Sequence, residues 1–328
     1  MSRAPFTWKT TRRYVVAFLL VAGQLVAFRP LVQDASAGRS GGCTQTFSTT
    51  PLTDLATGTY KGFQGGLYPT GTNVIPRTYS DIGMKRAALV EPLSGAGTPN
   101  PNGRIVFLAV GMSNTRMEFA SLMTLANADP AVNPDLVLVN GAQPGADASK
   151  ISDPAAAYWP DITKTLIGGG VTAKQVQVVW LKEAIANENR PFPADAAALR
   201  DDLREIVVIM RDRFPNLRLV YLASRSYGGY ATIPLNPEPF AFESGFAVKW
   251  LIEQDVATPA AEQPWLAWGP YFWTNGLLGR SDGFVWTCAD VAADGTHPSP
   301  TGSTKLAQQL LGFFEQSPTT KTWFTAGG

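Results

Sequence analysis

Residues 105–115 read IVFLAVGMSNT, and this stretch is the strongest guide to the fold. Its first six residues are all apolar, which is typical of a β-strand covered on both faces. The strand runs into Gly111 and Ser113, and an apolar pattern of helical spacing follows as far as Leu125. We therefore expect Ser113 at the carboxyl end of a buried strand and at the start of a helix, where its backbone N–H has no intrahelical acceptor.

Further strands and helices alternate along the rest of the chain. The predicted strands are Leu136–Val139, Val176–Leu181, Leu217–Ala223 and Trp265–Trp273, and the predicted helices cover 195–214, 241–256 and the residues after Ser299-Pro300. Such alternation indicates the α/β class, with a parallel central sheet between two layers of helices. Ligands bind such sheets at the carboxyl ends of the strands, the edge where we expect Ser113, Gly141 and Lys182.

His297 is the only histidine of the 328 residues, and it lies in the segment Asp294-Gly-Thr-His-Pro298. A single histidine excludes zinc sites that are built on two or three imidazoles. Taken alone, His297 is compatible with a residue that has no chemical task, and the motif around Ser113 favours an ordinary helix cap. Together with Asp294, three residues upstream, the two residues form the set that nucleophilic catalysis by serine requires.

The order Ser, Asp, His, with the acid and the base three residues apart, resembles the SGNH (GDSL-like) hydrolase superfamily. Gly111–Thr115 is similar to the first block of its carbohydrate acetylesterase members, Asn140-Gly141 to the second block, and Asp294–Pro298 to the last. The resemblance covers residues 105–314. It implies a flavodoxin-like three-layer α/β/α sandwich that hydrolyses esters. Ser113 would be the nucleophile, His297 the base and Asp294 its orienting acid, and the N–H groups of Ser113 and Gly141 would hold the oxyanion.

The third block departs from the family pattern. Lys182, within Val179–Ala184, stands where acetylesterase members carry a glutamine that donates to the oxyanion. Three alternatives stay open: Lys182 supplies a positive charge to the oxyanion hole, Asn187 or Asn189 replaces the amide, or Lys182 points into solvent. Aromatic and polar residues of Arg225–Tyr230, with Trp268 and Trp273, either line the pocket or belong to the core.

Two other serines match the pattern Gly-x-Ser-x-Gly, in 38–42 and 279–283. Neither has an apolar strand before it and a helix after it, as a nucleophile elbow requires, so we reject both Ser40 and Ser281. The sequence has no phosphate-binding loop, dinucleotide fingerprint or metal-ligand cluster, and we expect no cofactor.

Residues 1–37 have the layout of a secretory signal peptide, with a basic start, an apolar run from Tyr14 to Phe28 and a small-residue site at Ala35-Ser36-Ala37. A loop-rich extension over 38–103 and a hydrolase domain over 104–328 would then follow. The whole chain has 27 Lys/Arg and 26 Asp/Glu, of which the leader holds five and one, so the mature chain carries a formal net charge of −3. This charge gives no electrostatic reason to bind nucleic acid.

The sequence therefore predicts an exported serine esterase that removes small acyl groups from a small-molecule or glycan ester. An uncleaved N-terminal anchor would instead tether it to a membrane. A lipid or thioester hydrolase with the same three residues is one alternative, and a non-catalytic carbohydrate- or wall-binding module is another. Cys43 and Cys288 are the only cysteines, and they either form one disulfide in an oxidising compartment or remain two buried thiols.

Overall fold

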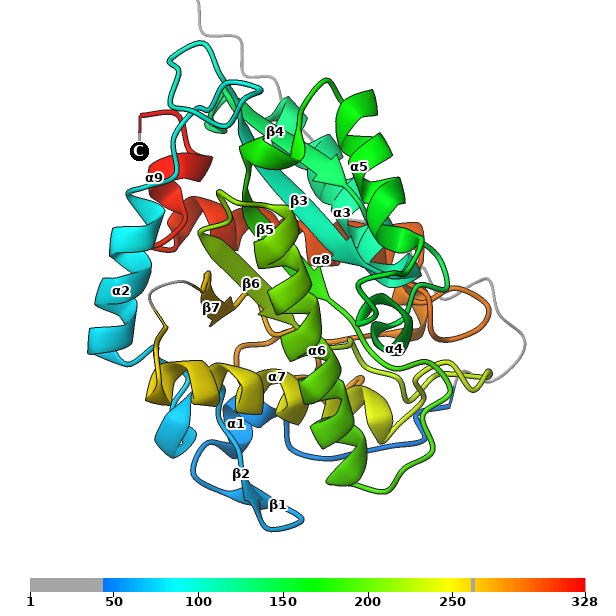
Figure 1. The fold of residues 1–328 in the computed structure, drawn as a ribbon. Coiled ribbons are helices and arrows are strands. Elements are labelled where there is room, and N and C mark those ends of the chain that lie inside the picture. Colours follow the sequence, from blue (N-terminus) through cyan, green and yellow to red (C-terminus); the bar gives the residue numbers. More distant parts are fainter. Residues whose placement is uncertain (1–43, 261–262, 328) are drawn as a thin grey trace, which may run out of the picture. The chain divides into compact units, whose positions relative to one another are not determined.

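The computed structural model describes residues 44–260 and 263–327, and its centre is a parallel sheet of five strands. The strand order is β4-β3-β5-β6-β7, and every neighbouring pair is parallel (Figure 1). The strands are β3 (Ile105–Gly111), β4 (Leu136–Asn140), β5 (Val176–Lys182), β6 (Leu219–Ala223) and β7 (Trp265–Trp268). The predicted α/β fold is confirmed, and its strands begin and end within a few residues of their predicted bounds, except that β7 ends five residues early, before Gly269-Pro270.

Helices cover both faces of this sheet. On one face α3 packs against α8, and on the other α6 packs against α7, with α5 beside β4 (Figure 1). These helices are α3 (Ser113–Ala128), α5 (Tyr158–Gly168), α6 (Ala194–Arg213), α7 (Phe240–Ala257) and α8 (Pro300–Gln316). The sheet therefore lies between two helical layers, as the predicted α/β/α sandwich requires.

Aromatic packing fixes the layer that carries Ser113. The ring of Phe107, in the middle of β3, lies 5.3 Å from Phe119 of α3 and 4.7 Å from Phe314 of α8, centroid to centroid. All three side chains are fully buried. Buried aromatic rings of this kind dominate core energetics, so the strand before Ser113 and the helix after it are held as one packed unit.

The N-terminal part contains a helix, α2 (Arg77–Ala87), that the sequence pattern did not predict. Before α2 come α1 (Leu52–Leu55), the hairpin of β1 (Thr59–Tyr60) and β2 (Phe63–Gln64), and a 3₁₀ turn (Pro69–Gly71). Helix α2 packs against β6 and β7, and a Cβ on Gly83 would lie 2.5 Å from the Trp265 ring. Its buried residues are Tyr79, Gly83 and Ala87, two of them small, so the helix lacks the apolar stripe by which sequence patterns are recognised.

The starts of α8 and α6 differ in their caps. The Ser299 hydroxyl accepts a hydrogen bond of 3.1 Å from the Gly302 N–H and so caps α8. Helix α6 begins after Pro193 without a side-chain cap, and Asp195 lies buried inside its first turn. The remaining short helices are α4 (Ala148–Ile151), the 3₁₀ turns Ala173–Gln175 and Cys288–Asp290, and α9 (Lys321–Phe324).

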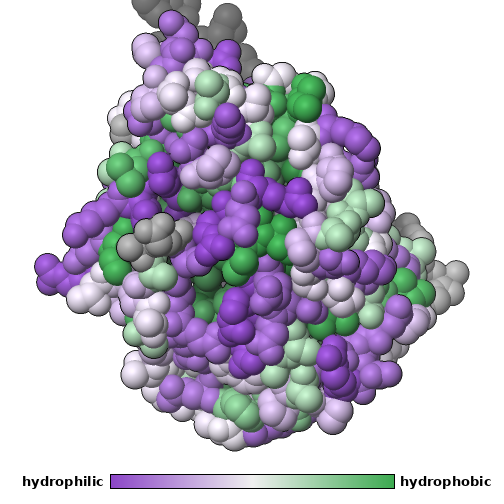
Figure 2. Space-filling model, viewed as in Figure 1, coloured by the Kyte–Doolittle hydropathy of each residue, from purple (hydrophilic) through white to green (hydrophobic). Residues whose placement is uncertain are grey.

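The surface over α5, α6 and α7 mixes hydrophilic and hydrophobic residues, with no single large apolar area in this view (Figure 2). In the described part of the chain, no helix is long and apolar enough to cross a bilayer. The described residues belong to one compact unit that begins at Arg39. Residues 1–37 lie outside them, so the signal peptide stays a prediction.

Candidate active site

Ser113 begins α3 directly after the short link that follows β3. Gly111 has a φ of 156°, and a Cβ at this position would lie 2.4 Å from the Lys182 carbonyl oxygen and 2.4 Å from Thr115 Oγ1. Thr115 Oγ1 donates a hydrogen bond of 2.6 Å to the same Lys182 carbonyl. Glycine therefore allows the first turn of α3 to close against the end of β5, which sets the position of Ser113.

The structure brings Ser113, His297 and Asp294 together although 184 residues separate the serine from the histidine. Ser113 Oγ lies 2.7 Å from His297 Nε2, and His297 Nδ1 lies 2.6 Å from Asp294 Oδ2. The other carboxylate oxygen, Asp294 Oδ1, accepts the backbone N–H groups of Thr296 at 2.9 Å and His297 at 3.0 Å. A serine, an imidazole and a carboxylate thus form one continuous chain of hydrogen bonds.

Electrostatics favour the ionised form of Asp294. Partial burial raises the pKa of its carboxyl, but the hydrogen bonds from the His297 ring and from two backbone N–H groups outweigh this, and the pKa lies below its usual range. The side chains of His297 and Asp294 are 24% and 27% exposed. The carboxylate is therefore charged at neutral pH, and the imidazole remains accessible to small molecules.

A neighbouring loop holds the segment that carries the acid and the histidine. Thr232 donates its N–H to the Asp294 carbonyl at 2.9 Å. Gly295 has a φ of 69°, and a Cβ there would lie 1.7 Å from the Tyr230 carbonyl oxygen. From the other side, Asn114 Nδ2 donates to the Thr296 carbonyl at 3.1 Å. The loop after β6 and the first turn of α3 therefore clamp the segment between them.

The structure corrects the predicted role of Gly141. Its N–H donates a hydrogen bond of 3.1 Å to the Ala109 carbonyl, because the ladder between β4 and β3 continues one residue past the strand. Gln143 then donates its N–H to the Gly111 carbonyl at 2.9 Å. Two residues on, Gly145 has a φ of 75° and open space where a Cβ would be, and no residue in the described ranges accepts its N–H. Gly145 is thus a candidate donor that the sequence analysis missed; Pro144-Gly145 is the turn signal that marks it.

Lys182 belongs to a buried ion pair. Its Nζ lies 2.6 Å and 2.7 Å from the two carboxylate oxygens of Glu118 in α3, and both side chains are at most 1% exposed. Burial lowers the pKa of Lys182 to about 8, although the Glu118 carboxylate acts to raise it. Both predicted roles of Lys182 are therefore wrong: the ammonium group neither points into solvent nor is free to bind an oxyanion. Asn187 and Asn189 are exposed residues of the following loop.

Two tryptophans of the predicted pocket have structural partners. Trp268 donates its indole N–H to the Leu67 carbonyl at 2.8 Å, and Trp273 donates to Glu238 Oε1 at 2.7 Å. Both side chains are buried. They belong to the core, which was one of the two interpretations of these residues.

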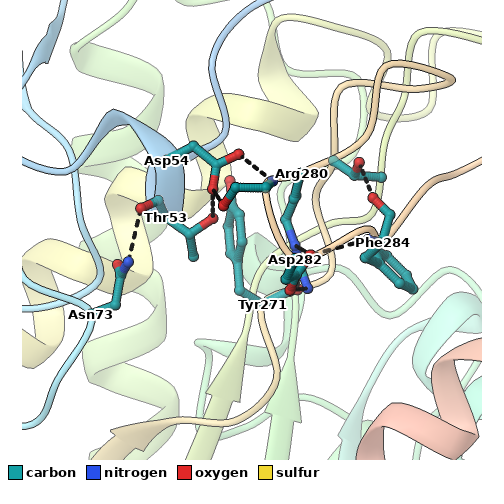
Figure 3. Close-up of polar contacts among 9 residues, drawn as sticks. Thr53, Asp54, Asn73, Tyr271, Arg280, Asp282 and Phe284 are labelled. Carbon is teal, nitrogen blue, oxygen red and sulfur yellow. Dashed lines mark hydrogen bonds and ion pairs between the residues drawn. The ribbon is translucent and has the colours of Figure 1, made fainter.

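Ser281, in the rejected pattern of residues 279–283, has a different environment. Its hydroxyl donates to Asp54 Oδ1 at 2.7 Å, and its N–H donates to Asp54 Oδ2 at 2.8 Å. Figure 3 shows Asp54 beside the turn in which Arg280 pairs with Asp282. Since the only imidazole of the chain is paired with Ser113, Ser281 has no base of this kind, and its contacts connect α1 to the turn. Ser40, the other rejected serine, lies outside the described residues.

The remaining predictions concern cysteines and metals. Cys288 is disulfide-bonded, whereas Cys43, the other half of the predicted bridge, lies outside the described residues. Over residues 44–260 and 263–327, no group of three or more histidine, cysteine or acidic side chains is arranged to hold a metal ion.

No protein-family model and no curated protein matches the sequence. Similar solved structures include a carbohydrate esterase family 3 protein from Talaromyces cellulolyticus, which is 15% identical with a TM-score of 0.38 over 62% of this chain and 93% of that chain. They also include an acetylxylan esterase from Geobacillus stearothermophilus, which is 16% identical with a TM-score of 0.39 over 63% of this chain and 92% of that chain. Both of these neighbours are esterases, but the likeness is too low to assign their chemistry to this chain.

Proposed function

We propose that this protein is a serine esterase in which Ser113 is the nucleophile. The observation that carries the proposal is the chain of short hydrogen bonds from Ser113 Oγ through the His297 ring to Asp294. A serine hydroxyl is a weak nucleophile until a neighbouring base removes its proton. His297 is the only imidazole of the chain, and its Nε2 lies within hydrogen-bond distance of that hydroxyl.

The steps follow from this arrangement. Ser113 Oγ attacks the ester carbonyl while His297 Nε2 takes its proton, and Asp294 stabilises the imidazolium that forms. The proton then passes to the leaving alcohol, and an acyl group remains on Ser113. Water, deprotonated by the same imidazole, hydrolyses this acyl-enzyme and releases the carboxylic acid.

The negative charge that develops on the carbonyl oxygen needs hydrogen-bond donors. We assign this role to the N–H groups of Ser113 and Gly145. The first lies at the start of α3, where helix N–H groups have no intrahelical acceptor and the helix dipole favours negative charge. The second has no acceptor in the described part of the chain, and its loop is tied to β3 through the bond from Gln143 to Gly111. Such preorganised donors contribute about 10²–10³-fold each in rate.

For the substrate we propose small acyl esters of carbohydrates, acted on by an exported enzyme. The supports are the similarity of residues 111–115 to acetylesterases and the signal-peptide layout of residues 1–37. Long-chain lipid esters or thioesters are the alternative substrates for the same three residues, and a carbohydrate-binding protein without turnover is the non-enzymatic alternative.

A single set of assays tests these possibilities. Purified protein lacking residues 1–37 should hydrolyse p-nitrophenyl acetate faster than longer p-nitrophenyl esters, and a fluorophosphonate should label Ser113. The Ser113→Ala variant should lose both properties, while Ser121→Ala, on the same helix, retains them. A preference for long acyl chains would favour the lipid or thioester alternative. Absence of both turnover and labelling in the wild type would exclude the esterase.

A further inference from the structure

Arg225 is a buried side chain that the proposed mechanism does not use. It lies two residues beyond β6, at the same edge of the sheet as Ser113, and its N–H donates to Ser244 Oγ at 3.1 Å. The residue is only 3% exposed. Within residues 44–260 and 263–327, its guanidinium group makes no hydrogen bond and no ion pair, and Nε is completely enclosed without an acceptor.

Arg225 lies within electrostatic range of one of the proposed catalytic residues. Burial lowers its pKa more than four nearby carboxyl groups raise it, and these groups are Glu118, Glu183, Glu238 and Asp294. Glu118 lies on the helix that Ser113 begins, and Asp294 is the acid that orients His297. The guanidinium is therefore within electrostatic range of Asp294 and of Lys182, which pairs with Glu118, yet no carboxylate in the described residues forms an ion pair with it.

Three of the four carboxyl groups already have other donors. Both oxygens of Glu118 bind Lys182 Nζ. Both oxygens of Asp294 are occupied by the His297 ring and by two backbone N–H groups. The Glu238 oxygens accept hydrogen bonds from three N–H groups, those of Gly228, Phe242 and the Trp273 indole.

The fourth carboxyl group, Glu183, is poorly suited to neutralise the guanidinium. It is 1% exposed, and burial raises its pKa well above the usual value. Its Oε2 accepts the Ala184 N–H at 3.1 Å, and its Oε1 has no hydrogen-bond partner in the described part of the chain. None of the four carboxyl groups therefore forms a hydrogen bond or an ion pair with the Arg225 guanidinium in the described residues.

An enclosed guanidinium without a protein partner is suited to an acceptor from outside the protein. It keeps its charge at every physiological pH and presents five N–H donors in a planar fork. Water satisfies the donors but not the charge, whereas a carboxylate satisfies both and matches the fork with two parallel hydrogen bonds. The ligand that enters this edge of the sheet is, on the proposed function, the ester substrate.

We propose that Arg225 binds a negatively charged group of the substrate, so that the enzyme prefers esters that carry a carboxylate close to the ester bond. This inference rests on the proposed esterase function and adds a substrate class to it. Arg225 then acts in specificity, through the substrate, while Ser113 and His297 carry out the chemistry.

The test compares charged esters with neutral esters of similar size. One pair carries the charge on the acyl side, p-nitrophenyl hemisuccinate against p-nitrophenyl butyrate. The other carries it on the leaving group, 4-acetoxybenzoate against its methyl ester. In at least one pair, the wild type should have a higher kcat/KM for the charged ester than for the neutral one. In that pair, Arg225→Gln should lower the ratio of the two kcat/KM values about 10- to 100-fold, mainly because KM for the charged ester rises.

Two variants separate recognition from folding. Arg225→Lys keeps the charge but lacks the planar fork, so it should restore part of the preference. Arg211→Gln removes an exposed guanidinium that pairs with Asp212, and should leave the ratio at the wild-type value. Far-UV circular dichroism and the thermal midpoint show whether each variant folds. A constant ratio in folded Arg225→Gln, with both esters affected equally, would overturn the inference, as would a wild type without preference for the charged ester in either pair.

Binding without turnover tests Arg225 independently of catalysis. Calorimetric titration of Ser113→Ala with succinate and with benzoate should show binding of at least one of them, at least tenfold weaker after Arg225→Gln is added. If neither anion binds, the inference fails even where esters are hydrolysed. If an anion binds through Arg225 but the wild type hydrolyses no ester, the proposed function fails and the anion site stands.

Discussion

Two serines of this chain occur in nearly the same sequence context and have opposite environments. Ser113 follows Gly111 by two residues, and Ser281 follows Gly279 by two residues. Each hydroxyl lies 2.7 Å from its main partner, but the partner of Ser113 is the His297 imidazole and that of Ser281 is the Asp54 carboxylate. The difference shows that the residues around a glycine-serine pair in space, more than the pair itself, determine what the serine can do.

The backbone around the two serines explains the difference. Ser113 lies between a fully buried strand and a 16-residue helix, so the N–H groups at the helix start lie at the edge where a substrate can bind. Ser281 lies in the turn closed by the hydrogen bond of 2.9 Å from the Gly283 N–H to the Arg280 carbonyl, and its own N–H is already used by Asp54. An ionised aspartate is also a weak base at neutral pH, because its ordinary pKa is about 4.

The largest effect is expected at Asp294, the acid that pairs with His297, and it is compared with Asp54, the acid that contacts Ser281. Asp294→Asn keeps the size of the side chain but removes the charge that orients His297 and stabilises its protonated form, so kcat should fall about 10⁴-fold. Asp54→Asn, at the matched position beside Ser281, should leave kcat within about twofold, because nothing connects Asp54 to His297. Steady-state kinetics on p-nitrophenyl acetate measure both.

Equal losses in the two variants would contradict this assignment. Retention of full activity by Asp294→Asn would show that His297 does not depend on the carboxylate. The thermal midpoints of both variants identify any loss that arises from unfolding.

The sequence predicted those features of the Ser113 site that depend on local pattern. The apolar run 105–110 and the spacing of Asp294 and His297 determine the strand and the acid–base pair, because both follow from neighbours in the chain. The hydrogen-bond donors for the oxyanion, in contrast, depend on which backbone N–H groups find no acceptor in the folded chain. Gly141 continues the ladder to Ala109, and Lys182 pairs with Glu118 from another element, contacts that a single sequence does not encode in its spacing.

The next largest effect is expected from replacing Gly295, which lies between Asp294 and His297, and it is compared with Gly283, which lies in the turn of Ser281. Gly295→Ala places a Cβ 1.7 Å from the Tyr230 carbonyl oxygen at a φ of 69°, so the segment with Asp294 and His297 must move. A displacement of about 1 Å at reacting groups costs about 10²-fold in rate, and we expect a loss of that size in kcat/KM. Gly283→Ala has a similar φ of 85° but no atom within 4 Å of the new Cβ. It should cost only about 1 kcal/mol of stability, with normal activity.

Kinetics and urea unfolding of both glycine variants test this pair. If Gly295→Ala retains wild-type kcat/KM, then the contact with Tyr230 does not position the acid and the histidine. If Gly283→Ala is inactive as well, positive φ alone, and not the contact, explains the loss.

A smaller effect concerns stability and pH. The pKa of Asp294 is lowered in the folded protein, so its ionisation stabilises the fold above the unfolded-state pKa of about 3.9. This contribution disappears as the pH falls through the folded-state pKa. We therefore expect Asp294→Asn to be destabilised by about 1 kcal/mol at pH 6, with the difference from wild type shrinking toward pH 3. Urea midpoints at the two pH values measure it, and a difference that grows on acidification would contradict the shift.

The smallest effect is expected at Ser281 itself. Ser281→Ala removes the hydroxyl that donates to Asp54 but keeps the backbone bond from the same residue, so the turn and α1 stay connected. Since the residue is exposed, water replaces the lost bond on Asp54, and the loss of stability should be less than about 1 kcal/mol. Hydrolysis of p-nitrophenyl acetate and labelling by a fluorophosphonate should both stay at the wild-type level. Loss of labelling in Ser281→Ala would reverse the assignment of the two serines, because it would mean that the hydroxyl paired with a carboxylate, and not the one paired with the imidazole, reacts.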